Sequence, residues 1–417
     1  MQRTGQQLLA SLSFTKQEGS EKRSLLKISQ YMKNKILLLF LTIASFHACT
    51  PSQKEIGANT IRPISIASDN PKIPIDSLIE EIKYIKLETN EENLIGLISK
   101  IIFTDQHIFI ADNVMANRIY MFDRNGHFLK KIGSIGNGPG EYLSIDHITL
   151  TPDRKKMVVV DDKKSQLLFY DLNGNYIESE STPYRAEIIE CVDDRHRIYA
   201  NTSGIYEGNA DLRETLLLTD NKGAVLLSAF PSSYTPEFNL VTHSDHLRKF
   251  NDRLYYNPNV TDTIYEVSLK GIVPRYVINV EHSIRPRRTG SSALADYISF
   301  IQTERSFNGT FIDTDRFFIV GLFPNGSSPV FYDKKKAEVY QISDTFVDPL
   351  SAFWGEGEIM TCCSDDWLAA GWSAEKVTAA YEKLPAADQA RLADLNISKE
   401  DNPVLFFYKL KGAGAQP

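Results

Sequence analysis

The sequence predicts an all-β fold: a six-bladed β-propeller with an N-terminal strand closing the last blade and two short helical insertions. One observation is a recurring hairpin, in which an apolar strand, a polar turn ending in glycine and a second apolar strand follow one another. Another is its period, since the turn glycines Gly126, Gly174, Gly223 and Gly271 are 48, 49 and 48 residues apart. A repeat of this length matches one four-stranded blade.

The turn chemistry supports these hairpins. Asn-Gly and Lys-Gly pairs supply the positive φ of a tight turn, and the preceding aspartate, as in Asp123 and Asp171, can accept hydrogen bonds from the turn's own backbone. Weaker copies end at Lys336 and Gly412, which makes six hairpins. A β-rich run upstream of each of the first five forms the second strand of its blade. These runs are 106–112, 154–161, 195–201, 251–257 and 315–321.

The last blade is predicted to take its fourth strand from the N-terminal side. Residues 351–354, 358–362 and 404–409 are expected to form three strands, which leaves that blade one strand short. Residues 82–88 form a further strand ahead of the first blade, with no partner of their own. Pairing this strand into the last blade would remove an exposed sheet edge and tie the ring shut.

The N-terminal region has the pattern of an export signal. Lys33 and Lys35 precede the apolar run 36–43, which is too short to cross a bilayer and is followed by Ala48 and Cys49. This pattern resembles a lipobox, in which the cysteine is acylated and becomes the mature N-terminus. Cys49 is therefore the predicted lipidation site. The alternative is an ordinary signal peptide with a chance cysteine.

We therefore expect three regions along the chain. Residues 1–48 are an upstream segment plus the signal peptide, with Met32 as the expected start, and residues 49–73 are the lipidated cysteine and a polar linker. Residues 74–412 form the propeller. These regions predict a lipid-anchored protein of the cell envelope, located at the outer membrane. They do not indicate whether it faces the periplasm or the cell surface.

The composition bears on the choice of partner. The net charge is −7 and the chain has no long basic stripe, so we expect no nucleic-acid partner. The sequence has no cysteine and histidine spacing typical of zinc, and we expect neither a cofactor nor a metal. Calcium is the alternative, held by the acidic pairs 161–162, 193–194 and 365–366, although solvated turns explain these pairs as well.

Three segments carry a resemblance to a known group of proteins: 84–89, 136–142 and 402–411. Through them the region 74–411 resembles the six-bladed β-propeller lipoproteins of Bacteroidota, relatives of NHL and TolB-type propellers. The resemblance implies the propeller fold and the cell-envelope location, and it implies little about function.

Two departures from the regular period predict which face of the propeller is functional. Loops between second and third strands and connections between blades lie on one face, where binding sites usually lie. The connection 281–306, with a helix expected over 292–305, and the segment 364–401, with a helix expected over 373–395, both fall on that face. We expect a decorated binding surface there. The alternative is that the helices only cap the channel and pack.

The candidate binding residues are of three kinds. Arginines can hold a carboxylate or an anionic sugar in a two-pronged contact, although solvated arginines are the plainer reading. A tryptophan near the sixth blade can stack on a sugar ring or pack in the core. A glutamate and a tyrosine follow a glycine-rich turn near the channel mouth, where they can contact a ligand or hold the turn. The candidates are Glu141, Tyr142, Arg185, Arg287, Arg288 and Trp367.

Two functions from different classes remain open. The first is a binding or scaffold lipoprotein that recognises a glycan, a peptide or a partner protein, favoured because the sequence carries no catalytic signature. The second is a propeller enzyme, such as a lactonase, a lyase or a glycan-cleaving protein, which would need a channel-centred metal or paired carboxylates. The fold alone does not choose between them.

Overall fold

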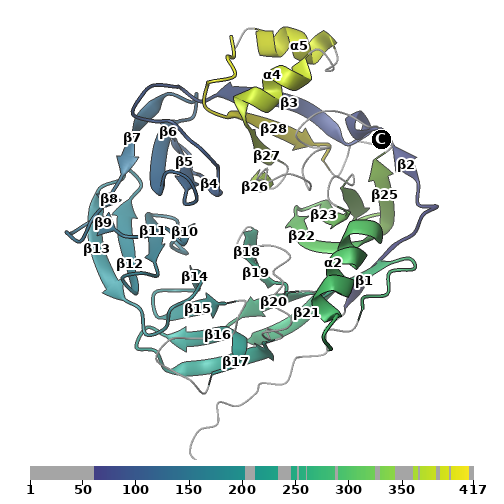
Figure 1. Cartoon of the computed structure of the whole chain (residues 1–417), viewed down its shortest axis with the longest axis horizontal. Helices are drawn as coiled ribbons and strands as arrows, with labels where there is room; N and C mark the ends of the chain where they lie inside the picture. Colours follow the sequence, from purple (N-terminus) through teal and green to yellow (C-terminus); the bar gives the residue numbers. More distant parts are fainter. Residues whose placement is uncertain are drawn as a thin grey trace, which may run out of the picture. The chain divides into compact units, whose positions relative to one another are not determined.

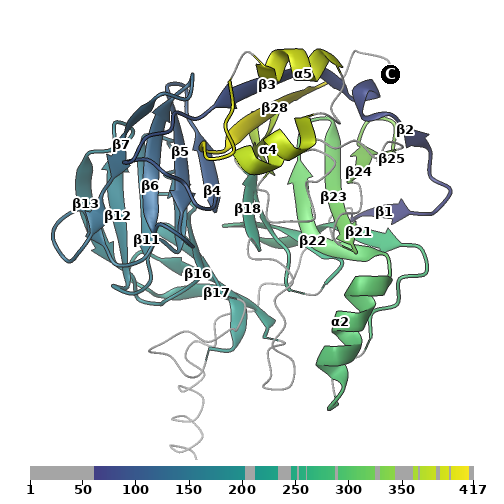
Figure 2. The ribbon, with the colours of Figure 1, turned by 45° about the horizontal axis from the view of Figure 1, so that its top comes forward.

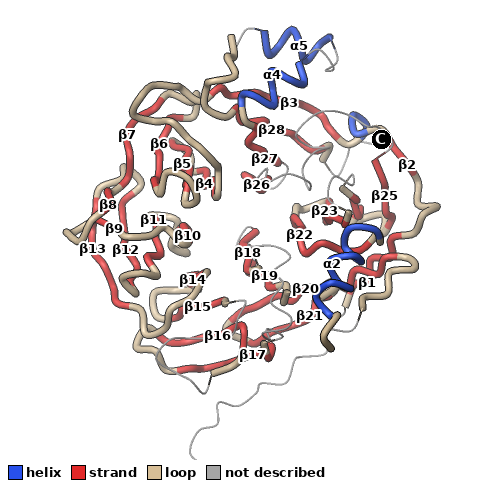
Figure 3. Tube along the Cα trace, viewed as in Figure 1, coloured by secondary structure: helices blue, strands red, loops and turns tan. Residues whose placement is uncertain are grey.

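The computed structural model describes residues 61–201, 212–232, 246–250, 253–259, 261–286, 290–324, 329–342, 360–364, 367–381, 386–393 and 396–412. All of them belong to the compact unit 53–417. Within this unit six sheets of four or five strands are arranged in a ring (Figures 1 and 3). The predicted six-bladed β-propeller is confirmed.

Each blade contains at least three consecutive antiparallel strands, of which the first lies innermost (Figure 1). Blade 1 contains β4 (Lys100–Phe103), β5 (His107–Asp112), β6 (Arg118–Asp123) and β7 (Phe128–Ile132). Blade 2 contains β10 (His147–Leu150), β11 (Lys156–Asp161), β12 (Gln166–Asp171) and β13 (Tyr176–Ser181). Blade 3 contains β14 (Ile188–Cys191), β15 (His196–Ala200), β16 (Glu214–Asp220) and β17 (Val225–Pro231).

The other three blades each include a strand from the N-terminal side of the propeller. Blade 4 contains β18 (Leu247–Phe250), β19 (Arg253–Tyr256), β20 (Thr263–Ser268), β21 (Gly271–Val280) and, at its edge, β1 (Arg62–Ile66). Blade 5 contains β22 (Ser306–Asp313), β23 (Phe317–Phe323), β24 (Val330–Asp333), β25 (Glu338–Ile342) and β2 (Lys72–Ile73). Blade 6 contains β26 (Met360–Ser364), β27 (Trp367–Trp372), β28 (Val404–Leu410) and β3 (Ile79–Lys86).

The hairpin turns form as their sequence predicts. The carboxylate of Asp123 accepts hydrogen bonds from the backbone N–H groups of Asn125 and His127, and Asp171 and Asp220 accept equivalent pairs in their own turns. The turn glycine Gly126 has a φ of +90°. A Cβ at that position would also collide with the carbonyl oxygen of Lys86, so this glycine permits both the turn and the approach of the closing strand.

The closing strand is confirmed. β3 pairs antiparallel with β28, with Lys86 opposite Val404 and Ile79 opposite Leu410. The rings of Tyr84 and Phe406 meet edge to face, with their centroids 4.9 Å apart. The blade thus gains its outer strand from a segment more than 300 residues away in the sequence.

Blade 6 differs from the prediction in its first two strands. The strand expected over 358–362 is β26, the innermost strand, and Trp367–Trp372 forms the second strand, β27, where none was expected. The predicted strand 351–354 lies outside the described residues. β27 has an Ala-Ala-Gly centre with low intrinsic β-propensity, but Leu368, Ala369 and Ala370 are fully buried between neighbouring strands. Packing therefore decides its conformation.

The segment expected to be a linker over 49–73 is partly built into the propeller. β1 runs parallel to β21 and β2 runs parallel to β25, so residues 62–73 cross the outer edges of blades 4 and 5. We call residues 62–73 the strap. Ile64 and Ile66 are each 1% exposed, and the carbonyl of Ile66 accepts from the N–H of Glu281. This alternation of buried isoleucines is the physical reason that the segment is a strand.

The helical insertions follow the prediction in outline. α2 (Ala293–Thr303) lies between blades 4 and 5, and Figure 2 shows it extending away from the sheets. The second insertion contains two helices, α4 (Ala374–Ala380) and α5 (Ala386–Ala393), in place of one. We call the face with these helices the insertion face, and the face with the turns between first and second and between third and fourth strands the turn face. Over the described ranges, no helix is both long and apolar enough to span a bilayer.

Candidate functional site

Two of the predicted binding residues hold the glycine-rich loop that precedes blade 2. The carboxylate of Glu141 accepts a hydrogen bond of 2.7 Å from the N–H of Gly138. Tyr142 is fully buried and its hydroxyl donates to the carbonyl of Ile132 at 3.1 Å, and burial raises the pKa of this hydroxyl to about 12. Burial leaves the side chain of Tyr142 no surface for a ligand, which supports the structural alternative for this residue. Glu141 is half-buried, and its contact with a ligand stays a prediction.

The remaining candidates are not brought together. Arg185 binds one carboxylate oxygen of Asp162 through Nε at 3.0 Å and a terminal nitrogen at 2.8 Å, on the insertion face. Trp367 begins β27 at the turn face, with the ammonium of Lys83 4.7 Å from its ring centroid. Arg287 and Arg288 lie outside the described residues, as does Cys49. Ligand binding by these residues therefore stays a prediction.

Three of the aspartates considered for calcium already have protein partners, and the pair 365–366 lies outside the described residues. Asp161 is fully buried and accepts from the N–H groups of Leu143 and Lys164, while Asp162 binds Arg185. Asp193 accepts from two backbone N–H groups of its own turn. Within the described ranges, no three His, Cys, Asp or Glu side chains are grouped as a metal site requires.

The inner strands of blades 2 and 3 share a buried polar cluster. The carboxylate of Glu190 on β14 lies 3.1 Å from Nε2 of His147 on β10 and accepts a hydrogen bond of 2.8 Å from the hydroxyl of Thr149. Burial tends to raise the pKa of Glu190. The hydrogen bond to His147 and the positive charges of His147, Lys249 and Lys100 outweigh burial and hold that pKa below its usual range. The cluster therefore joins two blades beside the propeller axis.

Replacing Glu190 by glutamine is expected to lower the free energy of unfolding by about 1.5–3 kcal/mol at pH 7, the usual contribution of a hydrogen bond to a charged group. Because the folded pKa lies below the unfolded value near 4.5, the carboxylate's contribution is complete above that value and is lost as the pH falls through the folded pKa. The deficit of the variant should therefore shrink in acid. Urea unfolding at pH 7 and pH 4 measures it, with the exposed Glu178→Gln as control. A deficit that is equal at both pH values would contradict this account.

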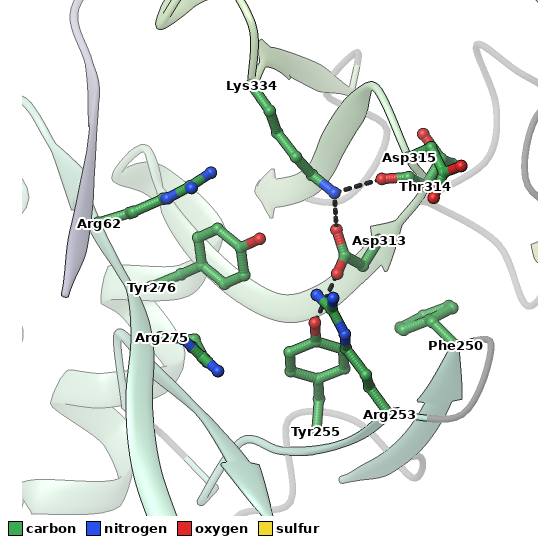
Figure 4. A pocket seen from close by; sticks show the side chains of 10 residues that line it. All are labelled: Arg62, Phe250, Arg253, Tyr255, Arg275, Tyr276, Asp313, Thr314, Asp315 and Lys334. Carbon is green, nitrogen blue, oxygen red and sulfur yellow. Dashed lines mark hydrogen bonds and ion pairs between the residues drawn. The ribbon is translucent and has the colours of Figure 1, made fainter. Parts of the chain in front are cut away.

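A pocket of about 560 Å³ opens between blades 4 and 5 (Figure 4). Its residues come from in and around the first turn of each blade, from the turn after β24, from the middle of β21 and from the start of the strap. The pocket therefore lies on the turn face, opposite to the face that the sequence predicted to be functional. It is lined by Arg62, Phe250, Arg253, Tyr255, Arg275, Tyr276, Asp313, Thr314, Asp315 and Lys334.

A buried acid organises the wall of the pocket. Asp313 accepts a hydrogen bond of 2.6 Å from the hydroxyl of Tyr255, and its other oxygen is ion-paired with Lys334 (Figure 4). Lys334 also donates to the carbonyl of Thr314. Burial and the charge of Asp313 raise the pKa of Tyr255, so this hydroxyl remains a donor at neutral pH. Lys334 and Tyr255 are thus committed to the wall.

Further donors face the pocket. Arg62 and Arg253 are both exposed, and neither has an ion pair among the described residues, although Arg253 is hydrogen-bonded to the side chain of Tyr255. Arg275 is bound to Glu266 at 2.6 Å. Tyr276 stacks on Phe318 with a centroid distance of 3.9 Å, and its hydroxyl points into the pocket in Figure 4. Burial and the charge of Asp313 raise the pKa of that hydroxyl, which keeps it protonated. The pocket lining carries four cations against two carboxylates, so it favours an anion.

The amino-acid sequence matches the model of one protein family. The family described as "Domain of unknown function (DUF4934)" matches residues 59–409. The chain belongs to this DUF4934 family. The family match begins at residue 59 and therefore includes the strap as well as the six blades. No curated protein matches the sequence significantly.

Two solved structures are similar to this member of the DUF4934 family. A protein from Bacteroides fragilis named "Putative exported protein" is 20% identical, with a TM-score of 0.68 over 85% of this chain and 100% of the other. A member of the DUF4221 family from Bacteroides vulgatus is 14% identical, with a TM-score of 0.45 over 80% of this chain and 97% of the other. At this identity the first structure supports the propeller fold and nothing finer.

Proposed function

We propose that the protein is an exported, lipid-anchored binding propeller, and that the pocket between blades 4 and 5 holds an anionic ligand. The observation that carries the proposal is the pair Arg62 and Arg253. Both guanidinium groups line the pocket together with three aromatic side chains, and neither forms an ion pair within the described part of the chain. Guanidinium groups bind carboxylates and phosphates through two parallel hydrogen bonds, so either group suits this pocket.

The lipid anchor and the export route rest on the sequence. Cys49 follows an apolar segment with the pattern of a bacterial lipoprotein signal, and the name of the similar Bacteroides fragilis protein agrees with export. A fixed pocket on a rigid propeller suits recognition, since the blades hold the pocket side chains in place without a conformational change. The glycan, peptide and protein ligands that the sequence leaves open can all carry a carboxylate or a phosphate.

Replacing Arg253 by glutamine is expected to weaken binding of the anion at least tenfold, because one charge-assisted hydrogen bond contributes about 1.5–3 kcal/mol. The measurement is isothermal titration of residues 50–417 with glucuronate, succinate, glycerol 1-phosphate and inorganic phosphate. Arg195→Gln is the matched control, because Arg195 is an exposed arginine in the corresponding turn of blade 3. Equal affinities of the two variants would contradict the proposal, and so would the absence of binding to every anion.

A further inference from the structure

The strap connects the pocket to the part of the chain that is predicted to carry the anchor. Arg62, the first residue of β1, lines the pocket, and the neighbouring Ile61 is half exposed. Arg62 is therefore the described pocket residue that lies nearest in sequence to Cys49. The pairing of β1 with β21, in which Arg62 lies opposite Tyr276, holds this residue at the edge of blade 4.

The length of the intervening chain limits how far the pocket can lie from a membrane. Twelve residues, 50–61, separate Cys49 from the strap. Even fully extended they span at most about 43 Å. If Cys49 carries the lipid, Arg62 and the pocket beside it are held within about 43 Å of the bilayer surface.

The charges around the pocket suit such a surface. Lys270 lies in the outer turn of blade 4, and Lys334, Lys335 and Lys336 form a run in the outer turn of blade 5. Lys270, Lys335 and Lys336 are exposed. The whole chain carries a net charge of −7, whereas these two turns carry four lysines; the exposed acids of blade 5 beside them are Asp315 and Glu338. Salt limits such attraction to about 8 Å at physiological ionic strength, so only a face held near the bilayer benefits from it.

We propose that the ligand of the pocket is the phosphate headgroup of an anionic membrane lipid, and that the surrounding lysines hold the turn face on the bilayer. The proposal rests on the proposed function and names the ligand class of the same pocket. Arg62 and Arg253 hold the phosphate oxygens, and the hydroxyl of Tyr276 donates to them. The pocket volume of about 560 Å³ leaves room for the glycerol or sugar beside the phosphate. The insertion face then points away from the membrane.

Vesicle co-sedimentation of residues 50–417, which contain the complete compact unit 53–417, tests this arrangement without the anchor. Binding to vesicles of phosphatidylcholine with phosphatidylglycerol is expected to exceed binding to phosphatidylcholine alone at least tenfold and to fall as salt is added. Arg253→Gln should remove most of the difference. The double variant Lys270→Gln, Lys335→Gln should weaken vesicle binding severalfold, while its affinity for soluble glycerol 1-phosphate stays the same.

The matched control is the double variant Lys155→Gln, Lys222→Gln, which removes two exposed lysines from the turns of blades 2 and 3 on the same face. An equal effect of the two double variants would overturn the proposed orientation. If soluble anions bind through Arg253 but anionic vesicles are not preferred, the proposal of a lipid ligand is wrong, while the proposal of an anion-binding pocket is supported. Failure of both measurements would overturn the proposed function itself.

Discussion

A chain that begins at residue 89 is expected to lose cooperative folding, because it lacks β3, the outer strand of blade 6. Without β3 the whole length of β28, from Val404 to Leu410, becomes an open sheet edge, and the ring is no longer joined between its first and last blades. An exposed apolar edge of this kind favours aggregation. Near-ultraviolet circular dichroism during thermal unfolding measures the loss.

A chain that begins at residue 74 is the matched control. It keeps β3 but loses the strap, and with it the burial of Ile64 and Ile66. Two buried isoleucines account for roughly 3–6 kcal/mol, so this chain should still unfold cooperatively, at a lower temperature than residues 50–417. If the chain from residue 89 melts as sharply as the chain from residue 74, β3 does not close the ring in the way that its pairing indicates.

The blade repeat could be predicted because each turn carries its own chemistry. The aspartates and glycines of the outer turns have local functions, and their period is visible without any knowledge of tertiary contacts. The closing strand was predictable for a similar reason, since a β-rich segment without a partner lay ahead of a blade that lacked one strand. Local signals of this strength are enough to determine the architecture.

Other elements depend on packing and carry weak local signals. β27 is a strand because its alanines fill a tight space beside β28, and its composition alone does not favour that conformation. The strap has two buried isoleucines, Ile64 and Ile66, and the half-buried Ile73 in a polar, proline-containing segment, which is typical of a linker. In both cases the tertiary environment determines the structure.

The pocket could not be found from the sequence, since no motif joins its residues. Arg62 and Lys334 are 272 positions apart and meet only because the strap crosses the edges of blades 4 and 5. Arg253 begins β19, directly after a turn that resembles the turn of Arg195 in blade 3, so its type and spacing give no sign of a special position. The helical insertions, from which the binding surface was predicted, lie on the opposite face.

Replacing Arg316 by alanine is expected to lower the free energy of unfolding by about 3–5 kcal/mol, the usual cost of removing one partner of a buried ion pair. Arg316 binds one oxygen of Asp333 through two nitrogens, at 2.9 and 3.1 Å, and also donates to the carbonyls of Lys411 and Gly412. It thus links blade 5 to the end of β28, and its loss leaves a fully buried carboxylate behind. Urea unfolding at pH 7 measures the change.

The same pair has a pH dependence that distinguishes a lost ion pair from simple loss of packing. Burial tends to raise the pKa of Asp333, but the hydrogen bond from Arg316 and those from the backbone of Lys336 and Lys335 outweigh it and lower that pKa. The pair's contribution is therefore complete above the unfolded value near 3.8 and is lost as the pH falls through the folded pKa. The deficit of Arg316→Ala should shrink below pH 4. The exposed Arg195→Ala should change stability by less than about 0.5 kcal/mol, and a deficit of Arg316→Ala that persists unchanged in acid would show that packing, and not the charge of Asp333, makes this residue necessary.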